Sequence, residues 1–456
     1  MRIAFISGGA AGMYCGSCIH DNLMASTLQD LGHDAALIPL YTPLRTDDES
    51  ASIDRVFYGA VNTYLDVKSS WIRRLPLGLR RFLDRPGLLR KVGEMGSAAD
   101  AKELGELTLA VLQGDEGPTR AELEQLAEWL AKDLRPQVVH LQNSLFVGLA
   151  RRIRELLGVP VISSLQGEDL FLDELIEPYR SQAIALIQRR SADLQGFTAN
   201  SEYYADHMAQ LLGLDRSLIS VVPLGLNLEG LDVAPTAEEG SGQSAAAAVA
   251  TATAVNGSNS GAADDVFTVG YFARLCPEKG LGVALEGFAD LAQRVGPEAV
   301  RFRAAGYLAP KDAPWLRQQI EKISEQGLGE RVEIVGEVDR QGKIDALRSF
   351  DVLTVPTVYR EPKGLFALEA MACGVPVVLA EHGTFPEMVE ETGGGVLVAP
   401  ESPAAVADAV ERLFHDPQQR WFLGKAGHAG VRRRHGARRA AESLLAVYDQ
   451  RGAVAS

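Results

Sequence analysis

The chain is poor in cysteine, in positive charge and in long apolar runs, and each shortage excludes a class of protein. Four cysteines in 456 residues indicate reduced thiols and not a disulfide framework. Lys and Arg number 45 against 60 Asp and Glu, and the net charge of -15 disfavours nucleic acid as a partner. The apolar run near Met1 is too short for a signal peptide, and no run reaches the roughly eighteen residues of a membrane span. We therefore expect a soluble cytoplasmic protein.

What is present is an ordinary globular composition, 46% hydrophobic and 23% charged, arranged in two blocks. Strand-like apolar segments alternate with helical patterns on both sides of 234–265, a stretch of Ala, Gly, Ser and Thr that cannot bury enough surface to fold. Two doubly wound α/β domains joined by a linker are expected. The divisions are 1–233 with an insertion at 41–135, the linker 234–265, a second domain at 266–430, and a C-terminal helix at 431–456. The expected strands are 2–7, 35–40, 138–141, 159–163, 196–199 and 219–222, then 266–271, 300–304, 332–335, 352–355, 377–379 and 395–398.

The most informative stretch is 361–376, which follows the apolar run 352–355 and reads as a turn and a short helix. The helix is apolar almost all round, so we expect it inside a domain. Glu369 is its exception, and a carboxylate there needs a cation, an amide or sugar hydroxyls as a partner. Gly364 permits close approach of a ligand, and the first free amides of the helix, from Leu365 on, form an anion site. Glu361, eight residues before Glu369, provides a second acceptor for hydroxyls.

This Glu-x7-Glu spacing, within Gly-Leu-x-x-Leu-Glu-Ala-Met-Ala-x-Gly-x-Pro-Val-Val, resembles the donor-sugar motif of the family-4 retaining glycosyltransferases. The resemblance implies the GT-B fold, in which two Rossmann-like domains face across a cleft. It also implies transfer of a sugar from a nucleotide-sugar to an acceptor hydroxyl, with Glu369 holding the ribose and Glu361 the sugar. Lys363 stands where the family more often has an aromatic residue. The structural alternative is a buried helix with one carboxylate.

Two cations follow the strand 266–271 on a loop that leads into a helix. Arg274 and Lys279 are placed to grip a diphosphate there. Their segment resembles the family's Gly-Arg-Leu-x-x-x-Lys-Gly, with Ala273 for the first Gly. The alternative is that Lys279 pairs with Glu278 or faces solvent. Because two cations can replace a metal, we expect neither a metal nor another cofactor. The segment 336–339, with Gly336 and Val338, resembles the part of the family that borders the base.

A glycine-rich loop follows the first strand. Small residues there permit backbone contact with a phosphate or a sugar, and the resemblance makes Gly8 and Gly9 donor contacts. NAD binding is disfavoured because no Asp or Glu ends the second strand. Cys15 and Cys18 are interpreted as small residues of a tight loop, since with His20 they do not complete a zinc site and the rest of a thioredoxin pattern is absent.

The strand 159–163 leads into Gln166, Glu168 and Asp169, at the kind of strand end where open parallel sheets bind ligands. The resembled family usually has a His that contacts the transferred sugar at the position of Gln166. A neutral amide can hydrogen-bond a hydroxyl but cannot carry a proton. Glu168 and Asp169 either bind or activate an acceptor hydroxyl or cap the next helix.

The segment Trp71–Val92 is basic and amphipathic, and is interrupted by Pro76 and Pro86. It is interpreted as a solvated face, with peripheral contact to an anionic membrane surface as the alternative.

A metal-independent hexosyltransferase is therefore the expected function. The alternatives are a non-catalytic nucleotide-sugar-binding protein of the same fold, a GT-B nucleotide-sugar epimerase, and a membrane-associated scaffold. The sequence leaves the base, the sugar, the acceptor and the oligomeric state open.

Overall fold

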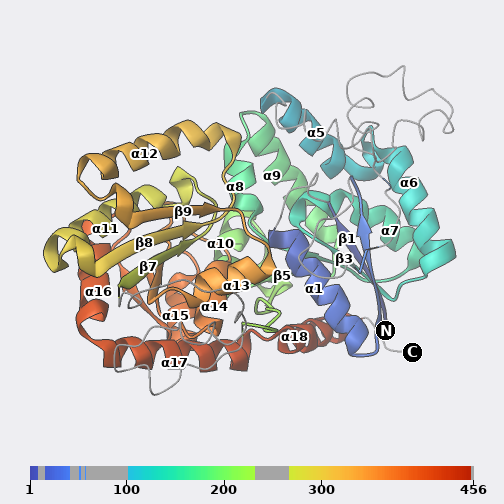
Figure 1. The fold of residues 1–456 in the computed structure, drawn as a ribbon. Coiled ribbons are helices and arrows are strands. Elements are labelled where there is room, and N and C mark those ends of the chain that lie inside the picture. Colours follow the sequence, from blue (N-terminus) through green and yellow to red (C-terminus); the bar gives the residue numbers. More distant parts are fainter. Residues whose placement is uncertain (9–15, 42–50, 53–56, 58–100, 232–265, 453–456) are drawn as a thin grey trace, which may run out of the picture. The chain divides into compact units, whose positions relative to one another are not determined.

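A computed structural model describes residues 1–8, 16–41, 51–52, 57, 101–231 and 266–452. These residues fall into two compact units (Figure 1). Unit 1 comprises Met1–Gly225 and Ala437–Ser456, and unit 2 comprises Leu226–Gly436. The expected linker 234–265 lies outside the described residues, so the domain boundary placed there stays a prediction.

Unit 1 is built on a six-stranded sheet in the order β2-β1-β3-β4-β5-β6, in which every neighbouring pair is parallel. Parallel strands covered on both faces read as continuous apolar runs, which is why the sequence located them well. Each begins and ends within two residues of its expected range. The strands are β1 (Arg2–Ser7), β2 (Asp34–Pro39), β3 (Val138–Leu141), β4 (Val161–Ser164), β5 (Gly196–Ala199) and β6 (Ile219–Val221).

Helices cover both faces of this sheet (Figure 1). Ile3 and Phe5 pack on one face with residues of the first and last helices, whereas Ala4 and Ile6 join the core on the other face. This alternation follows from the two-residue period of a strand. The helices are α1 (Gly16–Asp30), α5 (Ala101–Gln113), α6 (Arg120–Trp129), α7 (Ala150–Leu157), α8 (Glu168–Glu174), α9 (Tyr179–Arg190), α10 (Glu202–Leu212) and α18 (Ala437–Gln450).

The segment between β3 and β4 divides into a 3-10 turn over Ser144–Leu149 and α7. The turn begins at Asn143, whose side chain accepts a hydrogen bond from the Leu145 amide. It lies so close to α5 that a Cβ on Gly148 would be 2.3 Å from the carbonyl oxygen of Val111. The close contact, and not helix propensity, decides the backbone here.

Unit 2 repeats the design with the strand order β12-β11-β10-β7-β8-β9, again all parallel. Its strands are β7 (Phe267–Phe272), β8 (Val300–Ala305), β9 (Val332–Gly336), β10 (Val352–Thr354), β11 (Val377–Ala380) and β12 (Gly395–Val398). Its helices are α11 (Leu281–Val295), α12 (Ala313–Glu325), α13 (Arg340–Arg348), α14 (Leu365–Ala372), α15 (Phe385–Thr392), α16 (Pro403–His415) and α17 (Pro417–Arg434). The carboxyl ends of β10, β7, β8 and β9 lie side by side, so the loops that follow them meet at one edge.

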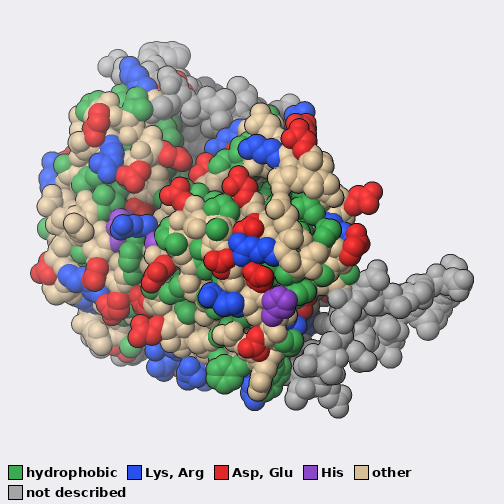
Figure 2. Space-filling model, turned by 90° about the vertical axis from the view of Figure 1, so that its left-hand side faces the viewer, with side chains coloured by type: hydrophobic (Ala, Val, Ile, Leu, Met, Phe, Trp, Pro, Cys, Tyr) green, Lys and Arg blue, Asp and Glu red, His purple; other side chains and the backbone are tan. Residues whose placement is uncertain are grey.

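On the face shown in Figure 2, acidic and basic side chains are interspersed and neither sign gathers in one area.

Candidate active site

The cation-bearing loop joins β7 to α11 and is fixed at both ends. Tyr271, fully buried in β7, has its hydroxyl 3.0 Å from the carbonyl oxygen of Arg274 and 3.3 Å from that of Lys279. Gly280 closes the loop at a φ of +74°, where a Cβ would lie 1.8 Å from the Pro356 carbonyl oxygen. No other residue fits without moving that backbone. The positions of both cations therefore depend on the core of unit 2.

Lys279 and Glu361 form an ion pair in which the carboxylate is buried and the lysine is half-buried. The Lys279 Nζ is 2.6 Å from Glu361 Oε2, and Tyr359 donates its hydroxyl hydrogen bond to the same oxygen at 3.0 Å. The backbone amides of Lys363 and Gly364 donate to Oε1 at 3.3 Å. Burial by itself raises the pKa of Glu361, but the Lys279 ammonium and these donors outweigh it, so the pKa lies below its usual value. Glu361 is thus an ionised, four-fold hydrogen-bonded carboxylate.

Aromatic rings complete the surroundings of Lys279. Its ammonium lies 5.0 Å from the centroid of the Tyr359 ring and 5.3 Å from that of Phe366. Rings at this distance stabilise a cation through their negative faces. Among the described residues, the carboxylate that pairs with Lys279 is that of Glu361. The alternative considered from the sequence, a pair between Lys279 and Glu278, is therefore not what the structure has.

The backbone of Glu361 is held by a turn whose role the sequence did not reveal. The Thr384 amide donates to the Glu361 carbonyl oxygen at 2.9 Å. Gly383 has a φ of +63°, and a Cβ there would lie 2.5 Å from the Glu361 nitrogen. His382 adds a contact between Nε2 and the carbonyl oxygen of Thr357 at 2.8 Å. The sequence does contain one signal for this turn: Gly383 and Thr384 come just after the carboxyl end of the strand β11, where site residues are expected.

Helix α14 is buried as expected, and its carboxylate has the expected kind of partner. Gly364 precedes the helix at a φ of +66°, and the half-buried Leu365 is its first residue. The requirement for a cation, an amide or a hydroxyl beside Glu369 is met by Lys343 of α13, whose Nζ lies 2.8 Å from Glu369 Oε1. Sequence reasoning missed Lys343, because no local pattern links two residues 26 positions apart on different helices.

The segment expected to border a base follows β9. Gly336 ends that strand at a φ of +80°, and its carbonyl oxygen accepts from the Gly306 amide at 2.7 Å. A Cβ on Gly306 would lie 1.8 Å from the carbonyl oxygen of Ala273, so the ends of β7, β8 and β9 are in contact. Val338 is half-buried, and Asp339 caps α13 by accepting from the Gly342 amide at 2.8 Å.

In unit 1, two glutamines connect the strand ends. Gly8 donates its amide hydrogen bond to Gln142 Oε1 at 2.9 Å, and Gln142 Nε2 contacts Cys18 Sγ at 3.5 Å. Gln166 Nε2 donates to the Gln142 carbonyl oxygen at 3.1 Å and to Asp21 Oδ1 at 3.0 Å. The structure therefore joins Gly8 to Gln166 through Gln142, and adds Asp21 from α1. Neither Gln142 nor Asp21 was singled out from the sequence, although Gln142 follows a predicted strand.

The carboxylates of Glu168 and Asp169 have partners within unit 1. Glu168 accepts from the Ser144 hydroxyl at 2.6 Å and from the Gln166 amide at 2.6 Å, and burial raises its pKa. Asp169 accepts from the Tyr204 hydroxyl at 2.7 Å. Both are buried in the first turn of α8. The expected alternative, that they cap the helix, is not what the structure has: α8 is preceded by Gly167 without a side-chain cap, and both carboxylates lie within its first turn.

Besides the linker, the predictions for Gly9, for Cys15 and for Trp71–Val92 fall outside the described residues. Within the described ranges, no helix is long and apolar enough to cross a membrane. The same ranges contain no group of three or more His, Cys, Asp or Glu side chains that could hold a metal.

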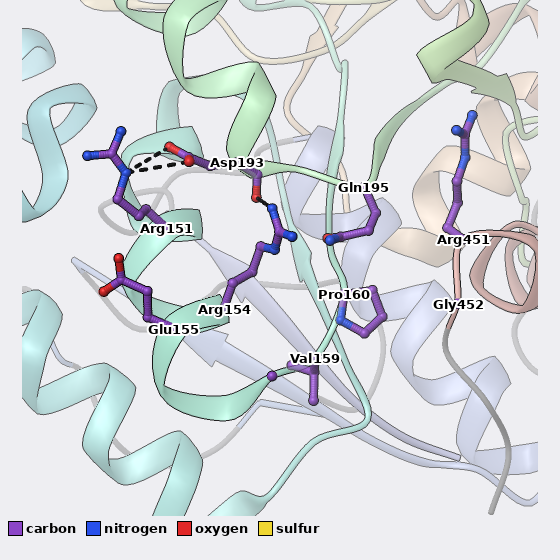
Figure 3. A pocket seen from close by; sticks show the side chains of 10 residues that line it. Arg151, Arg154, Glu155, Val159, Pro160, Asp193, Gln195, Arg451 and Gly452 are labelled. Carbon is purple, nitrogen blue, oxygen red and sulfur yellow. Dashed lines mark hydrogen bonds and ion pairs between the residues drawn. The ribbon is translucent and has the colours of Figure 1, made fainter.

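A cavity of about 600 Å³ in unit 1 contains none of the predicted site residues (Figure 3). It lies where β4 and β5 begin, whereas Gln166 follows the other end of β4. Arg154, in the last turn of α7, donates to the Asp193 carbonyl oxygen at 3.0 Å. Arg451, just after α18, donates to that of Ser217 at 2.9 Å. Cations at helix C-termini complement the helix dipole, which explains both arginines without a ligand.

The chain matches two protein families over separate ranges. Residues 104–229 match the family described as Glycosyltransferase Family 4, and residues 256–429 match Glycosyl transferases group 1. The chain belongs to the family-4 glycosyltransferases. The resemblance seen in the Glu-x7-Glu motif is thereby confirmed.

Curated members of the family are similar over part of their length. A D-inositol 3-phosphate glycosyltransferase of Xylanimonas cellulosilytica is 31% identical over 253 residues, which cover 55% of this chain and 56% of that one. A phosphatidyl-myo-inositol mannosyltransferase of Mycobacterium leprae is 32% identical over 157 residues, covering 34% and 39%. The chain thus spans about half the length, or less, of these relatives.

Solved structures place this glycosyltransferase-family chain in the GT-B fold. Anabaena Alr3699/HepE in complex with UDP aligns over 99% of this chain and 100% of its own, with a TM-score of 0.64 and 16% identity. Sucrose-phosphate synthase of Thermosynechococcus elongatus aligns over 98% of both chains, with a TM-score of 0.66 and 19% identity. The predicted fold class, two doubly wound α/β domains of the GT-B type, is confirmed.

Proposed function

We propose that this chain transfers a hexose from a nucleoside diphosphate sugar to an acceptor hydroxyl, with retention at the anomeric carbon and without a metal or other cofactor. The observation that carries the proposal is the shielded Lys279–Glu361 pair, which lies beside the start of α14 with its second carboxylate, Glu369. A cation, the amides at the start of α14, and two carboxylates, one after β10 and one on α14, suit a ligand with a diphosphate and several hydroxyls.

Unit 2 is proposed to bind the donor. Arg274 and Lys279, with the amides of Gly364 and Leu365, stabilise the negative charge that develops on the departing diphosphate. Glu369 accepts from the ribose hydroxyls, and Gly336 and Val338 border the base. An oxygen of the leaving diphosphate assists the incoming hydroxyl on the same face, as the family resemblance implies.

Glu361 is proposed to accept from hydroxyls of the transferred sugar. Its carboxylate already receives four hydrogen bonds, about the number that it can accept. A sugar hydroxyl must therefore displace one of them. The two backbone amides, at 3.3 Å, make the longest of the four contacts and are the easiest to replace.

Unit 1 is proposed to bind the acceptor through Gln166, and to contact the donor through Gly8 and Gly9. The internal partners of Glu168 and Asp169 favour a role in organising α8, which supports the Gln166 loop. The named relatives act on an inositol phosphate or a phosphatidylinositol, so polyols are the first acceptors to test. Location in the cytoplasm is part of the proposal, with Trp71–Val92 as a solvated face and peripheral membrane contact through it as the alternative.

A non-catalytic nucleotide-sugar-binding protein is the second candidate. Gln166 favours it, because an amide stands where the family usually has a His and cannot exchange a proton. An epimerase needs acidic and basic side chains that face the sugar ring. Gln166, which is neither, counts against that activity as well.

The test is a transfer assay with UDP-, GDP-, ADP- and TDP-hexoses and a set of polyols and inositol phosphates, with and without EDTA. We expect nucleoside diphosphate release that depends on the acceptor and resists EDTA, and a product with the donor's anomeric configuration by NMR. Donor binding without release would favour the non-catalytic candidate. Release that EDTA abolishes would overturn the metal-free mechanism.

A further inference from the structure

The second carboxylate of the motif has its own lysine, on an element that the motif does not include. Lys343 Nζ lies 2.8 Å from Glu369 Oε1, and the two side chains are only 13% and 15% exposed. Glu369 is the only charged residue of α14. An ion pair so shielded from water fixes the orientation of the carboxylate more firmly than an exposed pair does.

Lys343 is also joined to the segment proposed to border the base. Its amide donates to the Asp339 carbonyl oxygen at 2.8 Å. A Cβ on Gly342 would lie 3.0 Å from Val338 Cβ, so the turn before α13 lies tightly against the first turn of that helix. Any movement of α13 therefore moves Val338 and the Lys343 ammonium together.

We propose that Lys343 is a positioning residue that holds Glu369 in the orientation that binds the ribose diol, and thereby makes the site select ribonucleotides over 2′-deoxyribonucleotides. The inference rests on the proposed function and deepens it, because it names the class of donor. Lys343 occupies Oε1 of Glu369, so Oε2 is the oxygen that accepts from the ribose. A 2′-deoxyribose lacks the 2′-hydroxyl and so loses one hydrogen bond to the shielded Glu369 carboxylate. Hydrogen bonds to a charged group contribute more to the binding free energy than bonds between neutral groups.

A purely structural ion pair has a different signature. If Lys343 only stabilised the fold, its loss would weaken ribonucleotides and deoxyribonucleotides equally. A positioning role lowers affinity more for the ribonucleotide, which offers Glu369 both hydroxyls, than for the deoxyribonucleotide, which keeps only the 3′-hydroxyl. The ratio of the two affinities, and not either affinity alone, therefore distinguishes the two roles.

The experiment is calorimetric titration of the full chain with UDP, GDP and ADP and with their 2′-deoxy counterparts. We expect the wild type to prefer one ribonucleotide over its deoxy form by about tenfold or more. Lys343→Met should reduce that preference to about threefold or less, because affinity for the ribonucleotide falls more than affinity for the deoxy form. Lys343→Arg should keep the preference. Lys322→Met, an exposed lysine on α12, is the matched control and should behave as wild type.

Glu369→Gln provides the second arm. The preference should fall in this variant, and adding Lys343→Met to it should change the preference no further, because both act through one contact. A full preference in Lys343→Met, an equal loss for both ligands, or a wild type without preference would overturn the positioning role while leaving donor binding intact. A wild type that binds no nucleoside diphosphate would instead overturn the proposed function.

Discussion

At the scale of single residues, the candidate site contains two shielded ion pairs, Lys279–Glu361 and Lys343–Glu369, beside the exposed Arg274. Glu361 combines burial with one ammonium, one phenol and two backbone amides. Removing water from such a group is costly, and only a full set of donors makes the ionised form stable. The same arrangement keeps Lys279 in place between two aromatic rings. The site is therefore organised by its own contacts.

Lys279→Met is expected to lower the free energy of unfolding by about 3 kcal/mol, because it leaves the buried Glu361 carboxylate without its cation. Donor binding should weaken as well. The wild-type pKa of Glu361 is below its usual 4.5, so the stabilisation is present above pH 4.5 and is lost as the pH falls below it.

Denaturant titration of Lys279→Met, with the exposed-site control Lys322→Met, measures this effect. The double variant Lys279→Met/Glu361→Gln should regain part of the stability, since no charge is left buried. Equal stability of wild type and Lys279→Met at pH 7 would refute the account of this pair.

At the scale of elements, a buried chain of polar side chains ties α18 to the sheet of unit 1. His140 of β3 lies 2.9 Å from the Tyr448 hydroxyl through Nδ1 and 2.7 Å from the Ser164 hydroxyl through Nε2. Ser164 continues to the Thr198 hydroxyl at 3.0 Å. These hydrogen-bonded side chains thus span β3, β4 and β5, just before the strand ends that lead to Gln142 and Gln166. They fix those ends relative to one another.

Burial lowers the pKa of His140 to about 4 from its usual 6.5. Between these values the unfolded chain takes up a proton that the folded chain does not, so stability falls as the pH falls through this range. The full loss is about 3 kcal/mol. His140→Asn, which cannot titrate, should show a shallower decline between pH 6.5 and 4.

Urea titrations at several pH values test this prediction, with His415→Asn as the control because that side chain is exposed at the end of α16. The control should keep the wild-type slope. A His140→Asn slope as steep as the wild type's would show that another group governs acid unfolding.

At the scale of the whole molecule, the sequence predicted the strands and the fold class, because parallel strands are continuous apolar runs and need no knowledge of distant residues. It also predicted that Glu369 needs a partner. It did not predict Lys343, nor that Lys279 pairs with Glu361 across 82 positions, because such pairs depend on how loops from different strands converge. Gln142 was missed for a simpler reason. It follows β3, just as Gln166 follows the adjacent β4, but only the residues after β4 were considered as a ligand-binding strand end.

The central claim is that unit 2 binds a nucleoside diphosphate sugar through Lys279, Glu361 and Glu369. Thermal unfolding with a panel of UDP-, GDP-, ADP- and TDP-sugars tests it most directly, since a ligand at about a hundred times its dissociation constant stabilises by roughly 2.7 kcal/mol. We predict a clear rise in Tm with one nucleotide class, and a much smaller rise in Glu369→Ala and Lys279→Ala. No rise with any donor, or an equal rise in both variants, would contradict the account.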